Sequence, residues 1–584
     1  MNTLRYLKEH IPEVIGVIVC LAVQALCELS LPRYVASAVN DGIVRAQGGD
    51  MGYLAGVALA MFGLCLGSVV ASALCGFLAS RLAATVAKNL RSQIFSQVMR
   101  FSPAQVNSFT PSSLITRSTN DVTQIQMTIV LLLRIVLLAP LMGVIAIVQV
   151  LTLGGGLLWI VGAALLAVLA IMIALYVLAM PKFRRMQSLV DRVNLVAREM
   201  LDGVMSIRAF GREDHELEKF DGASRDLMET QLYVNRAMIL MMPALTLVMN
   251  LATVGIVWFG AHGVDVGSMQ VGDIMAFISY AMMIVMAFLM VSMVAVLLPR
   301  AEISAGRINE VLAEEPTIRE VEKPQSLAGS AAKGELAFND VSFAYPDAEG
   351  MVVEHVSFKT HPGKTTAIIG STGSGKSTLV QLAPRLYDPT GGEIELDGVD
   401  LRQLSLAELR SRIGYVPQQN FLFTGTIASN VKYGDTSISD DEMSRAIHLA
   451  QADDLVASSA NGVDTAITQG GTNVSGGQRQ RLAIARALAL RPEVLVLDDS
   501  FSALDYATDA RLRRALAEET KDMAVVVVAQ RVASIMQADE ILVLDEGKVV
   551  GQGTHQELLE TCPAYREIAT SQLSPEELGL GKEA

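Results

Sequence analysis

The sequence predicts two unlike parts: an all-helical membrane domain with six spans and long cytoplasmic helical extensions, followed by a soluble α/β domain. Three observations support this fold class. Hydrophobic residues make up 51% of the 584 residues and charged residues only 18%, whereas a soluble protein carries about 25% charged residues. Long uncharged runs occur in the first half of the chain. In the second half, short β-branched runs alternate with helical patterns, as expected for buried parallel strands.

The membrane spans follow from the uncharged runs. A bilayer core needs roughly 20 apolar residues in a helix, and residues 54–80, 135–181, 237–261 and 274–298 contain no charged side chain. Run 135–181 is long enough for two passes, separated by a Gly-rich turn at 153–156. The N-terminal apolar segment, interrupted by Glu28, is expected to be a retained first helix and not a cleaved signal peptide. The predicted spans are 12–38, 54–79, 129–152, 157–180, 237–262 and 271–297.

Basic residues predict the orientation of these spans. Segment 81–128 holds five Arg or Lys residues and segment 182–236 holds ten, whereas the three short opposite loops hold only Arg45. By the positive-inside rule, the two long segments and both termini are cytoplasmic. Each segment is expected to form a helical hairpin, because loops this long without their own structure are uncommon. The predicted tips of the hairpins are residues 103–113 and 210–220.

The predicted domains follow changes in composition along the chain. Residues 1–312 form the transmembrane domain, and residues 313–334, rich in Glu, Pro, Ser, Ala and Lys, form a linker. Residues 335–573 form the α/β domain, and residues 574–584 form a polar tail. The net charge of −14 argues against nucleic acid as a partner, since phosphate binding needs a basic surface. The five cysteines have no disulfide-framework or metal-ligand pattern.

A phosphate-binding loop follows the apolar run 365–369. It consists of Gly370, Ser371, Thr372, Gly373, Ser374, Gly375, Lys376, Ser377 and Thr378. The glycines allow backbone N–H groups to surround phosphate oxygens. In such a strand–loop–helix context Lys376 reaches the β and γ phosphates, and Ser377 holds Mg²⁺.

Two further motifs follow in the α/β domain. Residues 494–498 are an apolar strand that ends in Asp498, a carboxylate placed to hold the Mg²⁺ shell of a P-loop protein. A second motif consists of Ser475, Gly476, Gly477 and Gln478. It opens the helical stretch 479–488, and backbone N–H groups at the start of a helix bind anions.

The order of these motifs, with Gln418 between the loop and the SGGQ motif and Asp505 after Asp498, resembles the ATP-binding domain of ABC transporters. The six spans with two long cytoplasmic hairpins resemble the exporter branch, in which each half fuses six helices to one ATP-binding domain. The resemblance implies ATP and Mg²⁺ as cofactors. It further implies that Tyr345 stacks on adenine, that Gln418 contacts Mg²⁺ and couples to the membrane half, and that Asp505 lies at the dimer interface. In this family the SGGQ signature of one subunit completes the ATP site of the other.

Two departures from the family pattern concern the catalytic positions. Asp499 stands where the family has a Glu that acts on the attacking water, and Gln530 stands where it has a His that contacts the γ phosphate. Asp is one methylene shorter than Glu, and general-base geometry tolerates little misplacement. The double departure resembles the degenerate subunit of heterodimeric bacterial multidrug-type exporters. We therefore interpret this ATP site as one that binds ATP and hydrolyses it slowly, while the intact signature serves the partner's competent site.

The sequence thus predicts a subunit of an ATP-driven exporter in the plasma membrane of a bacterium, with its ATP-binding domain in the cytoplasm. The expected partner is a second, different ABC half-transporter, and the expected cargo is an amphiphilic small molecule. Alternatives are a peptide, lipid, thiol or siderophore cargo, a homodimeric slow ATPase, and a regulatory subunit that transports nothing. Glu28 is a candidate substrate contact, or it pairs with Gln24 or Arg33. The methionines of the sixth span are also candidates for substrate contact, or they serve helix packing; they are Met275, Met282, Met283, Met286, Met290 and Met293.

Overall fold

The computed structural model describes residues 10–43, 45, 51–153, 156–327, 333–346, 348–519, 521–574 and 577–578, without the side chains of 176, 180, 184 and 291–299. Residues 154–155 of the predicted turn, residues 328–332 of the predicted linker, most of the predicted polar tail and the side chain of Met293 lie outside this description. The chain divides into two compact units. One consists of Met1–Ser96 and Ser112–Ala313, and the other of Gln97–Pro111 and Glu314–Ala584.

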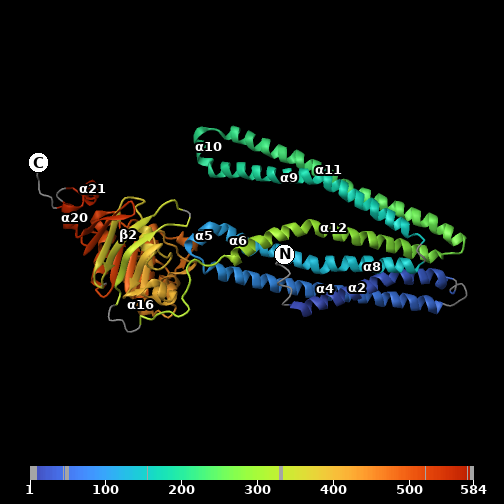
Figure 1. Cartoon of the computed structure of the whole chain (residues 1–584), viewed down its shortest axis with the longest axis horizontal. Coiled ribbons are helices and arrows are strands. Elements are labelled where there is room, and N and C mark those ends of the chain that lie inside the picture. Colours follow the sequence, from blue (N-terminus) through green and yellow to red (C-terminus); the bar gives the residue numbers. More distant parts are fainter. Residues whose placement is uncertain are drawn as a thin grey trace. The chain divides into compact units, whose positions relative to one another are not determined.

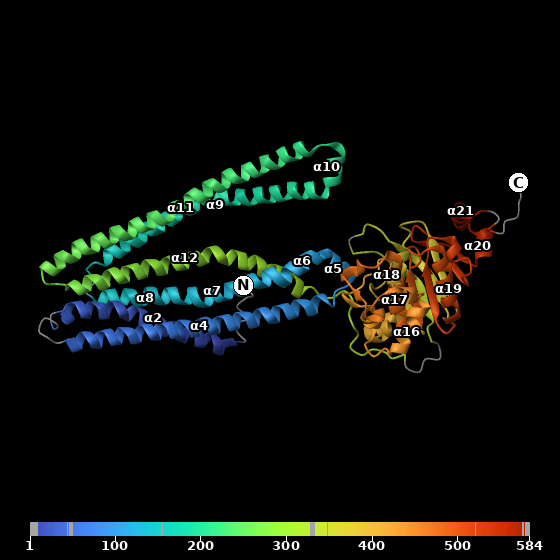
Figure 2. The ribbon, with the colours of Figure 1, turned by 180° about the vertical axis from the view of Figure 1, so that it is seen from behind.

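The first unit is built from long helices (Figures 1 and 2). They are α2 (Ile11–Ser37), α4 (Met51–Val98), α6 (Pro111–Thr116), α7 (Val122–Leu131), α8 (Leu137–Thr152), α9 (Leu158–Asp202), α10 (Val204–Phe210), α11 (Glu213–Asp265) and α12 (Val271–Ala313). Short π-helical segments join α6, α7 and α8 into one helix. Among the described residues, six helices are long and apolar enough to cross a membrane, as the sequence predicts.

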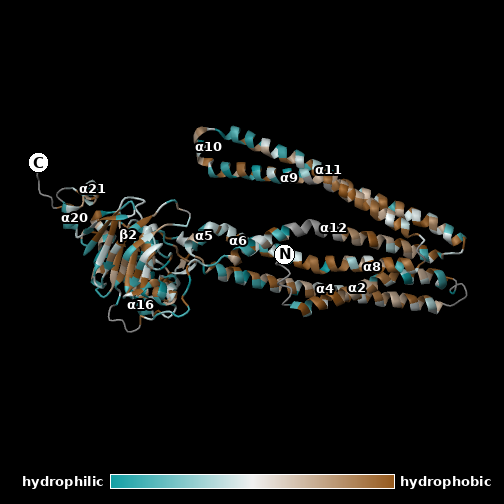
Figure 3. Ribbon diagram, viewed as in Figure 1, coloured by the Kyte–Doolittle hydropathy of each residue, from teal (hydrophilic) through white to brown (hydrophobic). Residues whose placement is uncertain are grey.

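Five of the described helices are longer than a membrane requires. Helix α4 has 48 residues, α9 has 45, α11 has 53 and α12 has 43, and the continuous helix Pro111–Thr152 has 42. At about 1.5 Å per residue, 45 residues extend about 67 Å, roughly twice the 30 Å hydrocarbon core. The surplus length forms the helical extensions. Figure 3 shows hydrophobic residues covering the part of α9 and α11 far from α10, whereas hydrophilic residues gather toward α10.

The second hairpin turns earlier than the sequence predicts. Helix α9 ends at Asp202, α10 forms the tip, and Gly211 stands in the left-handed region at φ 60° before α11 begins at Glu213. Residues 213–220 of the predicted tip are therefore helical. A left-handed glycine ends a helix without steric cost, and the acidic residues that follow favour the positive end of a new helix.

The second unit contains a six-stranded sheet in the order β12-β11-β3-β10-β9-β6, a four-stranded antiparallel sheet in the order β2-β1-β4-β5, and the pair β7-β8. The strands are β1 (Leu336–Phe343), β2 (Val353–Thr360), β3 (Thr365–Gly370), β4 (Gly391–Leu396), β5 (Val399–Asp400), β6 (Ile413–Val416), β7 (Gly425–Thr426), β8 (Ala466–Ile467), β9 (Val494–Asp498), β10 (Ala524–Val528), β11 (Glu540–Asp545) and β12 (Lys548–Gly553). The helices are α5 (Pro103–Phe109), α13 (Lys376–Gln381), α14 (Leu406–Arg412), α15 (Ile427–Val431), α16 (Asp440–Leu449), α17 (Asp453–Ser458), α18 (Gly476–Ala489), α19 (Tyr506–Glu519), α20 (His555–Thr561) and α21 (Pro563–Gln572).

The centre of the six-stranded sheet positions the site. Strands β3, β9 and β10 are parallel and almost fully buried. Val528 of β10 pairs with Ile368 of β3 on one side and with Asp498 of β9 on the other. The carboxyl ends of the three strands therefore meet at one edge. In open α/β sheets, ligands bind at this edge.

Candidate functional site

The phosphate-binding loop connects β3 to α13 in a backbone conformation that only glycine adopts without strain. Gly373 and Gly375 have φ of 85° and 93°. A Cβ on Gly375 would lie 2.6 Å from the carbonyl oxygen of Val352, so that position has no room for a side chain. The loop that begins at Gly370 thus keeps its backbone N–H groups available for phosphate oxygens.

Lys376 is folded over this loop. Its Nζ donates to the carbonyl oxygens of Gly370 and Ser371 at 3.0 and 2.6 Å and to Ser374 Oγ at 3.3 Å. Burial lowers the pKa of Lys376, while the nearby carboxylates of Asp499 and Asp498 act in the opposite direction. The ammonium is therefore held at the loop, where it can contact a phosphate group.

Two of the three residues predicted to hold Mg²⁺, Ser377 and Asp498, lie together at the end of β9. Ser377 Oγ donates to Asp498 Oδ1 at 2.9 Å. Asp498 is only 1% exposed, and burial raises its pKa, while the hydrogen bond from Ser377 opposes that rise. A hydroxyl and a carboxylate are ligands that suit Mg²⁺, which takes further oxygens from nucleotide phosphates and water. The donor set present here fits that ion.

Asp499 and Gln530, the residues at the two predicted catalytic positions, contact each other directly. Asp499 Oδ2 accepts from Gln530 Nε2 at 2.8 Å and from Gln418 Nε2 at 3.4 Å. Asp499 has φ 48° and is 8% exposed. Burial raises the pKa of Asp499, and hydrogen bonds from Gln418 and Ser502 act against that rise. Three residues that are far apart in the sequence thus form one cluster around a single carboxylate.

Tyr345 lies beside the helix that follows the loop. Its hydroxyl is 3.0 Å from Thr378 Oγ1, and its ring makes edge contacts with Phe343 and Tyr387. The ring is half-buried. An aromatic side chain in this place offers a surface on which a base can stack.

The signature residues begin α18. Ser475 caps the helix: its Oγ accepts from Gln478 N at 3.2 Å, and Gln478 Oε1 accepts from Ser475 N at 2.9 Å. A Cβ on Gly477 would lie 3.1 Å from the carbonyl oxygen of Ala503. Ser475 and Gly476 are exposed. Their hydrogen bonds in the described chain are not to the phosphate-binding loop, so the structure does not bring the two motifs together within one chain.

Asp505 lies in the segment between β9 and α19. Its Oδ1 accepts from Thr508 N at 2.9 Å, and this hydrogen bond lowers the pKa of Asp505. The carboxylate therefore has a capping contact in the single chain. The expected role at a dimer interface involves a second chain and stays a prediction.

Gln480 is a residue of this site that the sequence did not reveal. It is 3% exposed, its Nε2 donates to the carbonyl oxygen of Asp499 at 3.2 Å, and its Oε1 accepts from Ala503 N at 3.2 Å. The amide joins the signature helix to the backbone of the catalytic position. A polar residue among apolar ones on α18 is a signal that could have pointed to Gln480, but its partners could be identified only from the fold.

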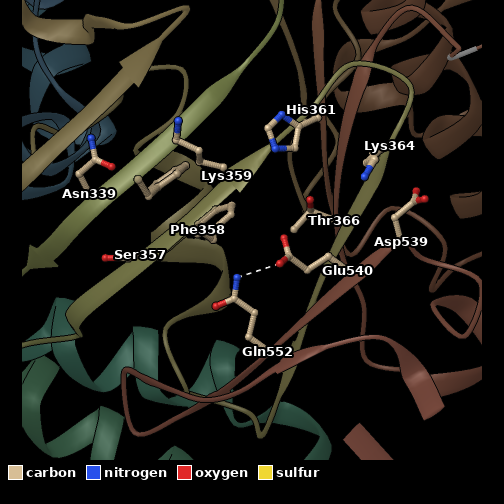
Figure 4. A pocket seen from close by; sticks show the side chains of 11 residues that line it. Asn339, Ser357, Phe358, Lys359, His361, Lys364, Thr366, Asp539, Glu540 and Gln552 are labelled. Carbon is tan, nitrogen blue, oxygen red and sulfur yellow. Dashed lines mark hydrogen bonds between the residues drawn. The ribbon is translucent and has the colours of Figure 1, made fainter. Parts of the chain in front are cut away.

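A hollow of about 520 Å³ lies elsewhere in the second unit (Figure 4). It includes Thr366 near the start of β3 and Glu540 at the start of β11, opposite to the edge that carries the phosphate-binding loop. Glu540 accepts from Gln552, and Asp539 accepts from the backbone of Thr365. Because these carboxylates have partners and the loop lies at the other strand ends, we do not assign the nucleotide to this hollow.

Glu28 has neutral partners in the membrane unit. Its Oε1 accepts from Gln24 Nε2 and from Ser68 Oγ, each at 2.9 Å. Gln24 was one of the two predicted partners, whereas Ser68 on α4 was not expected. Of the methionines on α12, Met275, Met282, Met286 and Met290 are exposed and Met283 packs against the core. Exposure leaves both predicted roles of these methionines open.

Comparisons with known proteins agree with this geometry. Residues 14–288 match the ABC transporter transmembrane region, and residues 353–502 match the ABC transporter family. An uncharacterized ABC transporter ATP-binding protein of Mycobacterium tuberculosis is 41% identical over 555 residues, which cover 94% of each chain. A corresponding Bacillus subtilis protein is 37% identical over 563 residues, or 96% of each chain.

Two further matches bear on the type of transporter. A multidrug efflux ATP-binding/permease protein of Mycobacterium bovis is 33% identical over 498 residues, which cover 84% of this chain and 40% of that protein. The structure of a bacterial Atm1-family ABC exporter with ATP bound superposes with a TM-score of 0.78 at 25% identity. That superposition covers 96% of this chain and 98% of the exporter chain.

Proposed function

This chain belongs to the ABC transporter family as an exporter-type half-transporter, and we propose that it pairs with a different half and carries the hydrolytically impaired ATP site of the pair. It is a multi-pass protein of the plasma membrane whose cytoplasmic domain couples ATP hydrolysis to transport. In the proposed heterodimer, ATP binding closes the two ATP-binding domains, and hydrolysis at the partner's site resets them.

The hydrogen bond between Asp499 and Gln530 supports the assignment of the impaired ATP site to this chain more than any other observation. The carboxylate at the position of the general base is held at 2.8 Å by the neutral amide that replaces histidine. Compared with Glu, Asp carries its carboxylate about 1.5 Å closer to the backbone, the length of one C–C bond. A misplacement of about 1 Å can lower a rate about 100-fold.

The short reach of the Asp499 side chain, and not the basicity of its carboxylate, limits the rate of ATP hydrolysis at this site. Burial raises the pKa of Asp499, so the carboxylate is not a weak base. The amide of Gln530 bonds to it and cannot supply the positive charge that a histidine can carry. Both substitutions therefore affect the hydrolytic step. Asp499 aligns the attacking water less well than Glu would, and Gln530 stabilises the charge on the γ phosphate less well than His would.

The residues that bind nucleotide are retained. Lys376 lies at the loop, and Ser377 and Asp498 are already 2.9 Å apart. Bound Mg²⁺ would neutralise phosphate charge, and Ser377, Asp498 and Gln418 are the residues that would hold it. We therefore expect ATP to bind tightly at this site and to remain largely intact there.

The signature of this chain is available to another subunit. Ser475 and Gly476 are exposed, and the capping hydrogen bonds of Ser475 preorganise the amino end of α18. A helix of 14 residues presents its N–H groups there, where a phosphate is favourable. This supports a role for the signature in the partner's site.

We propose amphiphilic small molecules as the cargo. Related proteins of Mycobacterium bovis and Bacillus subtilis are named as multidrug efflux and multidrug resistance transporters. Exposed methionines on α12 adapt to apolar ligands of varied shape. Glu28 has hydrogen-bond donors but no ion-pair partner among the described residues, which favours a cationic ligand near it.

Nucleotide recovery from the assembled complex tests the proposal. The transporter is loaded with radiolabelled ATP and Mg²⁺, turned over, freed of loose nucleotide and denatured. We expect about one retained nucleotide per complex, mostly as ATP, and its loss when Lys376 is replaced by Ala in this chain. Recovery of ADP alone in the Lys376-dependent fraction would refute the impaired site.

A further inference from the structure

The side-chain amide of Gln105 makes most of the hydrogen bonds between the tip of the first cytoplasmic hairpin and the start of the linker. Gln105 on α5 is 6% exposed. Its Oε1 accepts from the backbone N of Ser102 at 3.2 Å and of Thr317 at 3.1 Å. Its Nε2 donates to Glu314 Oε1 at 2.9 Å and to the carbonyl oxygen of Glu315 at 2.8 Å. We call Ser102, Gln105, Glu314, Glu315 and Thr317 the tip–linker cluster.

The cluster closes on itself and is braced by its surroundings. Thr317 Oγ1 donates to Ser102 Oγ at 2.9 Å, and Gln97 Nε2 donates to the carbonyl oxygen of Glu314. Phe101 and Phe109 stack at 5.7 Å across the tip. Helix α5 lies beside the ATP-binding domain in Figures 1 and 2, and Gln97–Pro111 belongs to the same compact unit as that domain.

The linker is bonded in turn to the domain that binds ATP. Arg385, which is 4% exposed and follows α13, donates to the carbonyl oxygen of Arg319 at 3.1 Å. Farther along, Gln325 N donates to the carbonyl oxygen of Gln403 at 2.9 Å. A path of hydrogen bonds and short chain segments thus runs from the helix after the phosphate-binding loop to the hairpin tip.

We propose that Gln105 is a positioning residue that fastens the tip of the first hairpin to the ATP-binding domain of its own chain, so that the two move as one body during transport. This inference rests on the proposed function, because it concerns how ATP-driven motion reaches the membrane. The tip continues into α4 on one side and α6 on the other, and the linker begins where α12 ends. Motion of the ATP-binding domain would therefore act on three helices through one cluster.

Only an amide satisfies this arrangement. The cluster needs an acceptor for the N–H groups of Ser102 and Thr317 and a donor for the oxygens of Glu314 and Glu315. Glu at position 105 would place a carboxylate against that of Glu314, and Leu would leave buried groups without partners. A reciprocal exchange, Gln105→Glu with Glu314→Gln, restores a donor and an acceptor between the two side chains.

Hydrogen exchange on the purified, assembled transporter tests the cluster without any substrate. We expect the amide of Thr317 to be protected both without nucleotide and with ATP and vanadate. In Gln105→Leu it should exchange at least about tenfold faster, while β9 remains protected and so reports intact folding. Loss of protection in the wild type with ATP and vanadate, or unchanged exchange in Gln105→Leu, would overturn the proposal.

Export measurements test whether Gln105 couples ATP hydrolysis to transport. Proteoliposomes are loaded with ethidium, a cationic amphiphile, and export is measured per ATP hydrolysed. Gln105→Glu should lower this ratio at least about fivefold with basal ATPase within about twofold, and Glu314→Gln in the same chain should restore most of it. Asn107→Leu, an exposed amide on the same helix, is the matched control and should behave as wild type. Failure of Glu314→Gln to restore coupling, or an equal loss in Asn107→Leu, would refute the role of Gln105. If the wild type does not export ethidium, the proposed cargo is wrong. Hydrogen exchange then tests independently whether Gln105 fastens the hairpin tip to the linker.

Discussion

Replacing Asp499 by Asn tests whether the ATP site of this chain is hydrolytically impaired or competent. The substitution removes the carboxylate but keeps its shape, and the Asn oxygen can still accept from Gln530, which lies 2.8 Å from the present carboxylate. Asn also tolerates the left-handed backbone of this position, where φ is 48°. The fold of the site should therefore be unchanged, so that any loss of activity reports chemistry.

The magnitude follows from the reach of the side chain. A working general base contributes about 10²–10⁴ to a rate, whereas a carboxylate set back by more than 1 Å has lost about 100-fold. If the Asp499 site turns over at about 1% of the partner's rate, removing its base changes the total ATPase by about 1%. We expect Asp499→Asn to retain at least about half of the wild-type activity, allowing for altered charge beside Lys376.

The assay is steady-state ATPase of the reconstituted complex at saturating ATP and Mg²⁺, with and without an amphiphilic substrate. Lys376→Ala in the same chain is the control that removes nucleotide binding from this site. A tenfold or greater loss in Asp499→Asn at unchanged ATP affinity would refute the reasoning, because Asp499 would then be the working base.

Three further changes follow from the same geometry. Asp499→Glu combined with Gln530→His should restore the family residues and raise the ATPase of the complex up to about twofold, since two sites would then turn over; a decrease with normal ATP binding would contradict this. Gln480→Leu leaves Ala503 N and the Asp499 carbonyl oxygen without their buried partner, at about 1–3 kcal/mol. Because Gln480 lies on α18, whose signature residues serve the partner's competent site in this account, steady-state ATPase should fall about tenfold while equilibrium ATP binding at this chain's own site is unchanged; equal loss of binding and turnover would argue for simple unfolding. Glu28→Gln should lower export of a cationic dye about tenfold and leave export of a neutral amphiphile unchanged; equal effects on both would assign Glu28 to helix packing with Gln24 and Ser68.

The sequence predicted the fold class because its signals are local. Uncharged runs of sufficient length identify spans, and the apolar runs 365–369 and 494–498 identify buried strands. The resemblance to the ABC family also placed Asp499 and Gln530 at one site, as the positions of the family's Glu and His. The structure adds that β9 and β10 are neighbours, which brings the two side chains into direct contact.

Other features depend on contacts that no local pattern records. Gln105 binds residues more than 200 positions later, and Ser68 reaches Glu28 from another helix. The second hairpin tip was placed too late because Gly211, and not the apolar pattern, decides where α10 ends. The signature and the phosphate-binding loop are not hydrogen-bonded to each other in the described chain, so the joint site that the family resemblance implies would need a second subunit.

The mass of the intact complex tests most directly whether this chain pairs with a different half-transporter that carries the competent ATP site. The tagged chain is purified from its native host in mild detergent and analysed by native mass spectrometry. The account predicts one copy of this chain together with one different ABC half-transporter, whose sequence should carry the Glu and His that Asp499 and Gln530 replace. A complex of two identical chains would contradict it, since Asp499 and Gln530 would then have to serve both ATP sites.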